Sequence, residues 1–139
     1  MLFRASASEP PACIDSELDL QRRRVRIRIE GAVTGPQVAR ELCRLLDQHP
    51  ETAGYDALYD LTRYAGSVGH ADLAPVRPVY ERARRPSAGP ARSAFITSDP
   101  AFQYWAAALD HQFPGRQHAA FPDEVAAEAY LRTPVRERA

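Results

Sequence analysis

The sequence contains no lysine and no asparagine, and its 18 basic residues are all arginine. These are balanced by 18 acidic residues, so the formal net charge is zero. Proteins dedicated to nucleic-acid binding are usually basic, so this balance argues against nucleic acid as a partner. We attribute the missing lysine, together with the abundant alanine, to a GC-rich genome.

Cysteine is also scarce, since Cys13 and Cys43 are the only two in 139 residues. Two cysteines do not make a disulfide framework, so reduced thiols in a cytosolic protein are the expectation. No apolar run approaches the roughly 20 residues needed to cross a bilayer. The first residues also lack the apolar stretch of a signal peptide. We therefore expect a cytoplasmic protein without a membrane span.

The length suits one domain, because domains typically contain about 100–150 residues. Hydrophobic residues make up 45% of the chain and charged residues 26%, a balance typical of globular proteins rather than disordered ones. Residues 1–12 are rich in serine, alanine and proline, and we expect a flexible tail there. Residues 13–132 then form the single domain, and residues 133–139 form a polar tail.

The clearest local pattern is an alternation between residues 22 and 30, which predicts a half-buried strand with its apolar side inward. The β-branched positions are Val25, Ile27 and Ile29, and the arginines between them are Arg24, Arg26 and Arg28. These arginines could bind an anion or RNA. They could instead pair with Asp56 and Asp60 of a neighbouring strand and form a solvated face, which is the interpretation that we favour.

Apolar periods and turn residues predict the remaining elements. We expect strands at 14–20, 57–61, 93–97 and 117–121. We expect helices from Thr34 to about His49, from about Asp72 to 85, from Ser98 or Asp99 to about 113, and from Pro122 to 132. A hairpin followed by alternating helices and strands indicates an α/β domain with about four helices. Its single mixed sheet combines an N-terminal antiparallel hairpin with parallel crossovers.

The sequence also predicts which residues of the last helix are buried and where most aromatic residues lie. Helical spacing places Val125, Ala129, Tyr130 and Leu131 on the buried face of the final helix. Most other aromatic residues are expected in the core, although they could equally line a ligand pocket between helices and sheet. They are Tyr55, Tyr59, Tyr64, Tyr80, Phe102, Tyr104, Trp105 and Phe113.

No sequence motif indicates catalysis or a cofactor. There is no P-loop, dinucleotide fingerprint or nucleophile elbow. Ser67, His70 and Asp72 lie too close in sequence to converge on one reacting atom. The histidines show no metal-ligand spacing, so we expect no metal site and ordinary surface or boundary positions for them. They are His49, His70, His111 and His118.

Several segments, in this order, resemble the STAS-like superfamily over about residues 14–132. They are the turn IEGAVTG, the strand YDALYDLTRYAG, the segment TSDPAF, and the closing AAFPDEVAAEAYL. The resemblance is to small bacterial proteins related to anti-sigma-factor antagonists and to Sec14-type lipid-binding folds. It implies a non-catalytic module that binds partner proteins, nucleotides or lipids. Anti-sigma-factor antagonists carry a phosphorylated serine in an Asp-Ser pair after the central strand; here Ser67 lies in that loop without the preceding aspartate.

We therefore expect a non-enzymatic regulatory module that binds a protein, a ligand or a second copy of itself, without a cofactor. The alternative is a small carrier of lipid or another hydrophobic ligand, or a small enzyme, using an internal pocket. The predicted partner-binding surface is the loop after the central strand, because such loops are exposed and close to helix N-termini. Its candidate residues are Thr62, Gly66, Ser67, Gly69 and Asp72.

Overall fold

The computed structural model describes residues 11–133. A five-stranded mixed sheet forms the centre of the protein. The strands lie side by side in chain order, with β1 antiparallel to β2 and all other neighbours parallel. Their bounds are β1 Cys13–Asp19, β2 Arg24–Glu30, β3 Asp56–Asp60, β4 Ala91–Ile96 and β5 Arg116–Phe121. The predicted hairpin and parallel crossovers are confirmed. The predicted tails fall mainly on residues 1–10 and 134–139, which lie outside the described residues.

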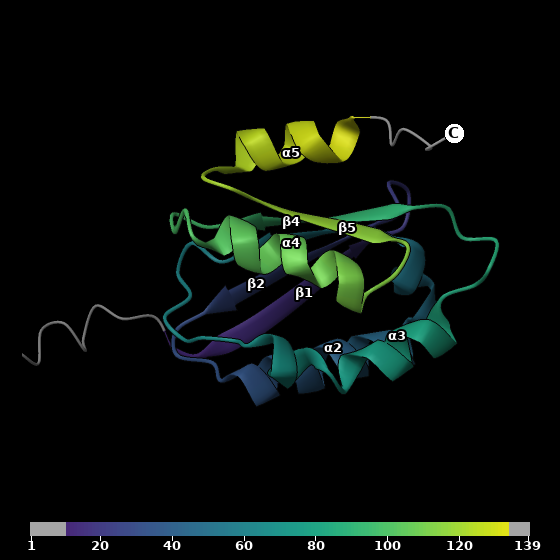
Figure 1. Ribbon diagram of the computed structural model, residues 1–139, viewed down its shortest axis with the longest axis horizontal. Helices are drawn as coiled ribbons and strands as arrows, with labels where there is room; N and C mark the ends of the chain where they lie inside the picture. The colour runs from purple at the N-terminus through teal and green to yellow at the C-terminus, as the bar shows by residue number, and fades with distance from the viewer. Residues whose placement is uncertain (1–10, 134–139) are drawn as a thin grey trace, which may run out of the picture.

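Within residues 11–133, four α-helices cover the two faces of the sheet, in agreement with the predicted number. They are α2 Gly35–Gln48, α3 Val76–Ala83, α4 Phe102–Gln112 and α5 Glu124–Arg132, and short 3-10 helices occupy Pro50–Gly54 and His70–Leu73. Figure 1 shows α5 on one side of the strands and α2 and α3 on the other. The main core contains residues of α2, α3 and α4 against β2, β3 and β4. A smaller core joins α5 to the opposite face.

The alternation in β2 places its two kinds of side chain on opposite faces of the sheet. Val25, Ile27 and Ile29 are buried in the main core, as predicted. The arginines face α5 instead. Because β1 continues the sheet, its acidic residues lie directly beside those arginines, in the pairs Asp15 with Arg28, Glu17 with Arg26, and Asp19 with Arg24.

The β1–β2 turn depends on one unusual backbone conformation. It contains neither glycine nor asparagine, and Arg23 adopts a left-handed φ of 54°, which is uncommon for a residue with a Cβ atom. The Asp19 carboxylate helps to fix the turn by accepting a hydrogen bond from the Arg22 backbone N–H at 3.1 Å.

Some predicted helix features are wrong in detail. The third α-helix begins at Phe102 rather than directly after Ser98 or Asp99, because the Asp99 carboxylate accepts from the Ala101 backbone N–H in a preceding turn. Helix α5 buries Ala127 and Leu131, whereas Val125 and Ala129, which were predicted on its buried face, are exposed. Tyr104 is likewise 83% exposed rather than in the core. Both errors arise because a short helix with many alanines does not define its buried face by periodicity alone.

Candidate functional site

The loop that connects β3 to the 3-10 helix has an exposed tip. Thr62, Gly66, Ser67 and Gly69 are all exposed, and the Ser67 hydroxyl makes no hydrogen bond with any residue between 11 and 133. The Thr62 hydroxyl donates to the Asp60 carboxylate at 2.7 Å. The loop therefore offers backbone and small polar side chains to the solvent at the carboxyl end of the sheet.

Two of the candidate residues have structural roles within the chain itself. Gly66 packs so closely that an added Cβ atom would lie 2.2 Å from the Val33 carbonyl oxygen. The Asp72 carboxylate accepts from the Gly69 backbone N–H at 2.8 Å. The same carboxylate lies against Gly35, at the N-terminus of α2, where an added Cβ would lie 2.1 Å from its Oδ2. A negative charge is favourable there because the helix dipole is positive at that end.

The base of this loop is held by contacts from three directions. Gly31 exchanges backbone hydrogen bonds with Arg63 and Ala65, both at 2.9 Å. The Tyr64 hydroxyl donates to the Val33 carbonyl at 2.9 Å. His70 stacks on the Trp105 ring, and its Nε2 lies 2.9 Å from the Trp105 carbonyl oxygen. The exposed tip therefore stands on an ordered base.

Asp60 connects the loop to the arginines on the α5 face. Burial opposes ionisation of its carboxyl group, but hydrogen bonds from Thr62 and the charges of Arg26 and Arg28 outweigh burial and lower its pKa. The Asp60 Oδ2 lies 3.7 Å from an Arg26 nitrogen and 3.9 Å from the Arg28 Nε. The predicted ion pairs are confirmed for Asp60. They are wrong for Asp56, whose carboxylate accepts from the Arg92 backbone N–H at 2.9 Å and forms no ion pair within residues 11–133.

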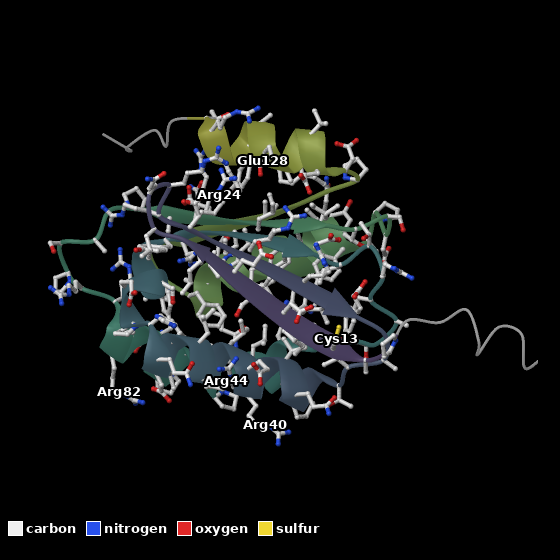
Figure 2. All side chains as sticks on the ribbon, turned by 180° about the vertical axis from the view of Figure 1, so that it is seen from behind. Cys13, Arg24, Arg40, Arg44, Arg82 and Glu128 are labelled. Carbon is white, nitrogen blue, oxygen red and sulfur yellow. The ribbon has the colours of Figure 1, made fainter. Side chains whose placement is uncertain are left out.

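Helix α5 covers part of the arginine stripe (Arg24, Arg26 and Arg28), so the predicted solvated face is only partly exposed. The Arg24 Nη1 lies 2.7 Å from a Glu128 carboxylate oxygen, and the two side chains point toward one another in Figure 2. Arg26 pairs with Glu124, also at 2.7 Å. The Arg24 side chain is 14% exposed and the Arg28 side chain 47%. Carboxylates of β3 and α5 thus form ion pairs with the stripe, and the acidic residues of β1 lie beside it in register.

A partly open cavity of about 100 Å³ lies between the sheet and helices α2, α3 and α4. Its wall is mainly apolar and includes Leu45, Val76, Phe95, Trp105 and Phe113. Tyr64, Val68 and Leu73 add a wall from the loop after β3. The predicted core position is confirmed for Tyr80 and Phe113, and several of the aromatic residues also line this cavity.

The polar residues of the cavity include a serine and a histidine on neighbouring strands. Ser93 on β4 is the register partner of His118 on β5, and both are buried. The His118 Nδ1 lies 3.0 Å from the Asp110 carboxylate, which also accepts from the His118 backbone N–H at 2.8 Å. Burial lowers the pKa of His118 to about 4, although the hydrogen bond with Asp110 opposes this shift. The predicted surface or boundary position of His118 is therefore wrong.

These residue types resemble a Ser-His-Asp triad, but their hydrogen bonds differ from one. No hydrogen bond joins Ser93 to His118 within the described part of the chain. The Ser93 hydroxyl instead accepts from the Arg116 Nη1 at 3.1 Å. A nucleophile needs a hydrogen bond to a base that is ready to take its proton, and a histidine with a pKa of about 4 is a weak base.

Arg116 brings a positive charge to the same cavity. Its Nη2 donates to the Ala53 carbonyl at 3.0 Å and to the Tyr55 carbonyl at 2.6 Å. Among residues 11–133, no carboxylate forms an ion pair with it, and no acceptor contacts its Nε. Sequence reasoning missed this cluster because its residues are distant in the chain. The sequence feature that could have indicated the cluster is a polar residue at an inward position of each of two predicted strands, Ser93 in 93–97 and His118 in 117–121.

Neither cysteine lies in a reactive setting, and both thiols are free. Cys43 is half-buried, burial raises the pKa of its thiol, and its Sγ lies 3.8 Å from the Pro75 carbonyl oxygen. Within residues 11–133, no group of three or more His, Cys, Asp and Glu side chains is arranged to hold a metal ion. No helix in this part of the chain is long and apolar enough to span a bilayer.

Comparison with solved structures identifies the fold. The chain is similar to an uncharacterized protein of the DUF3478 family with a SpoIIAA-like fold from Shewanella loihica PV-4, with a TM-score of 0.59 and 18% sequence identity. That match covers 86% of this chain and 92% of the other. The fold is STAS-like. A STAS-like fold is what the order of the sequence segments predicted, so the resemblance is confirmed at the level of the fold.

A second structure, an anti-sigma factor antagonist from Mycobacterium paratuberculosis, is similar with a TM-score of 0.49 and 15% identity. The match covers 90% of this STAS-like chain and 99% of that protein. No protein-family model matches the sequence, and no significant match is found among curated proteins.

Proposed function

We propose that the protein is a non-enzymatic regulatory module that binds a protein partner through the tip of the loop after β3. The surface comprises Thr62, Gly66, Ser67 and Gly69, with Asp72 at its edge. The observation that carries this proposal is the combination of an exposed tip with a base held by Gly31, Tyr64 and His70. A preordered surface loses less conformational entropy on binding than a mobile one.

The cavity does not support the alternative of a lipid carrier. Pockets that bind drug-sized ligands typically have volumes of about 300–1,000 Å³, whereas this cavity has about 100 Å³. A phospholipid or long-chain fatty acid would need a large opening of the core. Binding at the surface is therefore the better use of this fold.

The hydrogen bonds of Ser93 favour binding over catalysis in the same way. Arg116 donates to the hydroxyl that would have to act as nucleophile. Because its pKa is lowered to about 4, His118 is a weak base and would take a proton from a serine hydroxyl poorly. An enzyme using this cluster would require the Ser93 hydroxyl to leave Arg116 and to hydrogen-bond His118 instead.

The test is affinity capture with the wild-type chain and with Ser67→Arg as baits. An arginine at the tip adds bulk and charge at the centre of the proposed surface, so we expect the partner to be lost. Ser87→Arg is the matched control, because Ser87 is also exposed but lies in the loop before β4, at the opposite end of that strand. Any partner must then bind the purified chain in a two-component titration.

Three outcomes would contradict the proposal. The first is equal binding of the purified partner by wild type and Ser67→Arg. The second is loss of binding in Ser87→Arg alone. The third is a concentration-dependent dimer, measured by light scattering, that Ser67→Arg disrupts, since the loop would then bind a second copy. Ser67→Asp and Ser67→Ala complete the series by separating a negative charge from loss of the hydroxyl.

A further inference from the structure

We propose that the partly open cavity between the sheet and helices α2, α3 and α4 binds a small monocarboxylate with a branched aliphatic or aromatic body, held by the Tyr59 hydroxyl and the positive charge of Arg116. This site is separate from the loop tip proposed above. Both residues line the cavity, and they lie on β3 and at the start of β5.

Tyr59 supplies a hydrogen-bond donor that the protein leaves unused. Its ring stacks on Phe95 with centroids 4.7 Å apart, which fixes the side chain in the cavity wall. Within residues 11–133, no group hydrogen-bonds the Tyr59 hydroxyl. The hydroxyl oxygen is not among the fully enclosed polar atoms that lack a partner, so it is accessible from the pocket. An oxygen of a bound molecule would supply the missing acceptor.

Arg116 supplies the charge that selects an anion. Its Nη1 and Nη2 are held by neutral acceptors, including the Ser93 hydroxyl and the carbonyls of Ala53 and Tyr55. These contacts fix the guanidinium but do not neutralise it, and no carboxylate among the described residues pairs with it. Burial raises the pKa of the Tyr59 hydroxyl, and the charge of Arg116 opposes that shift, so the two groups share one electrostatic environment.

The volume and the wall determine the rest of the ligand. An apolar cavity of about 150 Å³ accommodates benzene, so about 100 Å³ suits a body of four or five carbon atoms, or a ring after slight expansion. The apolar wall includes Val76, Phe95, Leu109 and Phe113. A small acid such as 3-methylbutanoate matches both this wall and the positive charge, whereas a sugar or a nucleotide would leave polar groups unpaired.

The single tryptophan of the chain gives a direct readout, because Trp105 lines the cavity. The experiment titrates 3-methylbutanoate and benzoate into the full chain and follows tryptophan fluorescence and the thermal midpoint. We expect a saturable fluorescence change and a rise of the midpoint with ligand concentration. The neutral analogue 3-methylbutan-1-ol should bind about tenfold more weakly, since it lacks the charge that Arg116 attracts.

Two variants locate the site. Tyr59→Phe should fold normally because its hydroxyl has no partner to lose, and it should weaken 3-methylbutanoate binding about tenfold. Tyr104→Phe, on the exposed face of α4, is its matched control and should bind as wild type. Ala57→Leu should fill the cavity and abolish binding, while Ala108→Leu at an exposed position of α4 should not.

The proposal is overturned by the absence of a saturable signal with either acid. It is also overturned if the alcohol binds as tightly as the acid, or if Tyr59→Phe and a folded Ala57→Leu both bind as wild type. None of these results depends on capture of a protein partner. Failure of the cavity site and failure of the loop surface can therefore be distinguished.

Discussion

At the scale of single residues, burial of His118 makes the stability of the protein depend on pH. Burial lowers its pKa from 6.5 to about 4. The charge of Arg116 also lowers the pKa, whereas the hydrogen bond with Asp110 raises it. The unfolded state therefore binds a proton at a pH where the folded state does not. The stability that results is complete above pH 6.5 and is lost as the pH falls toward 4.

We expect the free energy of unfolding to fall by up to about 3 kcal/mol between pH 6.5 and pH 4 because of this residue. His118→Gln removes the titrating group and should flatten that part of the profile, measured by urea unfolding at several pH values. His111→Gln is the control because His111 is exposed. Parallel profiles for wild type and His118→Gln would show that His118 does not titrate as described.

Gly66 gives a second prediction at this scale. An added Cβ atom would lie 2.2 Å from a backbone oxygen of Val33, and backbone cannot move aside as a flexible side chain can. We expect Gly66→Ala to lower the free energy of unfolding by about 1–3 kcal/mol. Gly89→Ala, where nothing lies within 4 Å, should change it by less than about 0.5 kcal/mol. Equal stabilities in denaturant melts would refute the close approach.

At the scale of elements, α5 depends on its carboxylates as well as on its small apolar core. Glu128 pairs with an Arg24 side chain that is only 14% exposed. Glu128→Ala would leave that guanidinium poorly solvated, so we expect a loss of about 1–3 kcal/mol in the free energy of unfolding. Glu41→Ala removes a half-exposed pair with Arg44 and should cost less than about 0.5 kcal/mol. If Glu128→Ala and Glu41→Ala lose similar amounts of stability in thermal melts, the burial of Arg24 does not strengthen its ion pair with Glu128.

The elements also show what sequence patterns can and cannot reveal. The β2 strand was predictable because a period of two in β-branched residues specifies which face is buried. Helix α2 was predictable because Thr34 and Gln37 form a capping box before a clear apolar stripe. The cover of the arginine stripe by α5 was not predictable, because a pattern within one strand carries no information about a helix roughly one hundred residues later.

The candidate sites differ in the same way. The loop after β3 could be located because its glycines and serine follow an apolar run directly. The cavity cluster could not, because Tyr59, Arg116 and His118 come together only when β3, β4 and β5 align in register. Local patterns specify the elements, whereas the side chains that meet across strands depend on register.

At the scale of the whole molecule, we expect no hydrolase activity. The assay uses p-nitrophenyl acetate and p-nitrophenyl phosphate with the purified wild-type chain, compared with Ser93→Ala. Both proteins should give the background rate because the Ser93 hydroxyl accepts from Arg116 and has no hydrogen bond to His118. Turnover that Ser93→Ala abolishes would instead identify the Ser93, His118 and Asp110 cluster as catalytic.

The strand order has a consequence for synthesis of the chain on the ribosome. Because neighbouring strands are consecutive in the sequence, each strand can pair as soon as it emerges. The carboxylates of α5 are translated roughly one hundred residues after the arginines with which they pair. A nascent chain that stops before residue 124 therefore lacks Glu124 and Glu128, the α5 carboxylates that pair with Arg26 and Arg24. Until α5 is made, Arg26 has Asp60 of β3 as its ion-pair partner, whereas the pair that buries Arg24 cannot form.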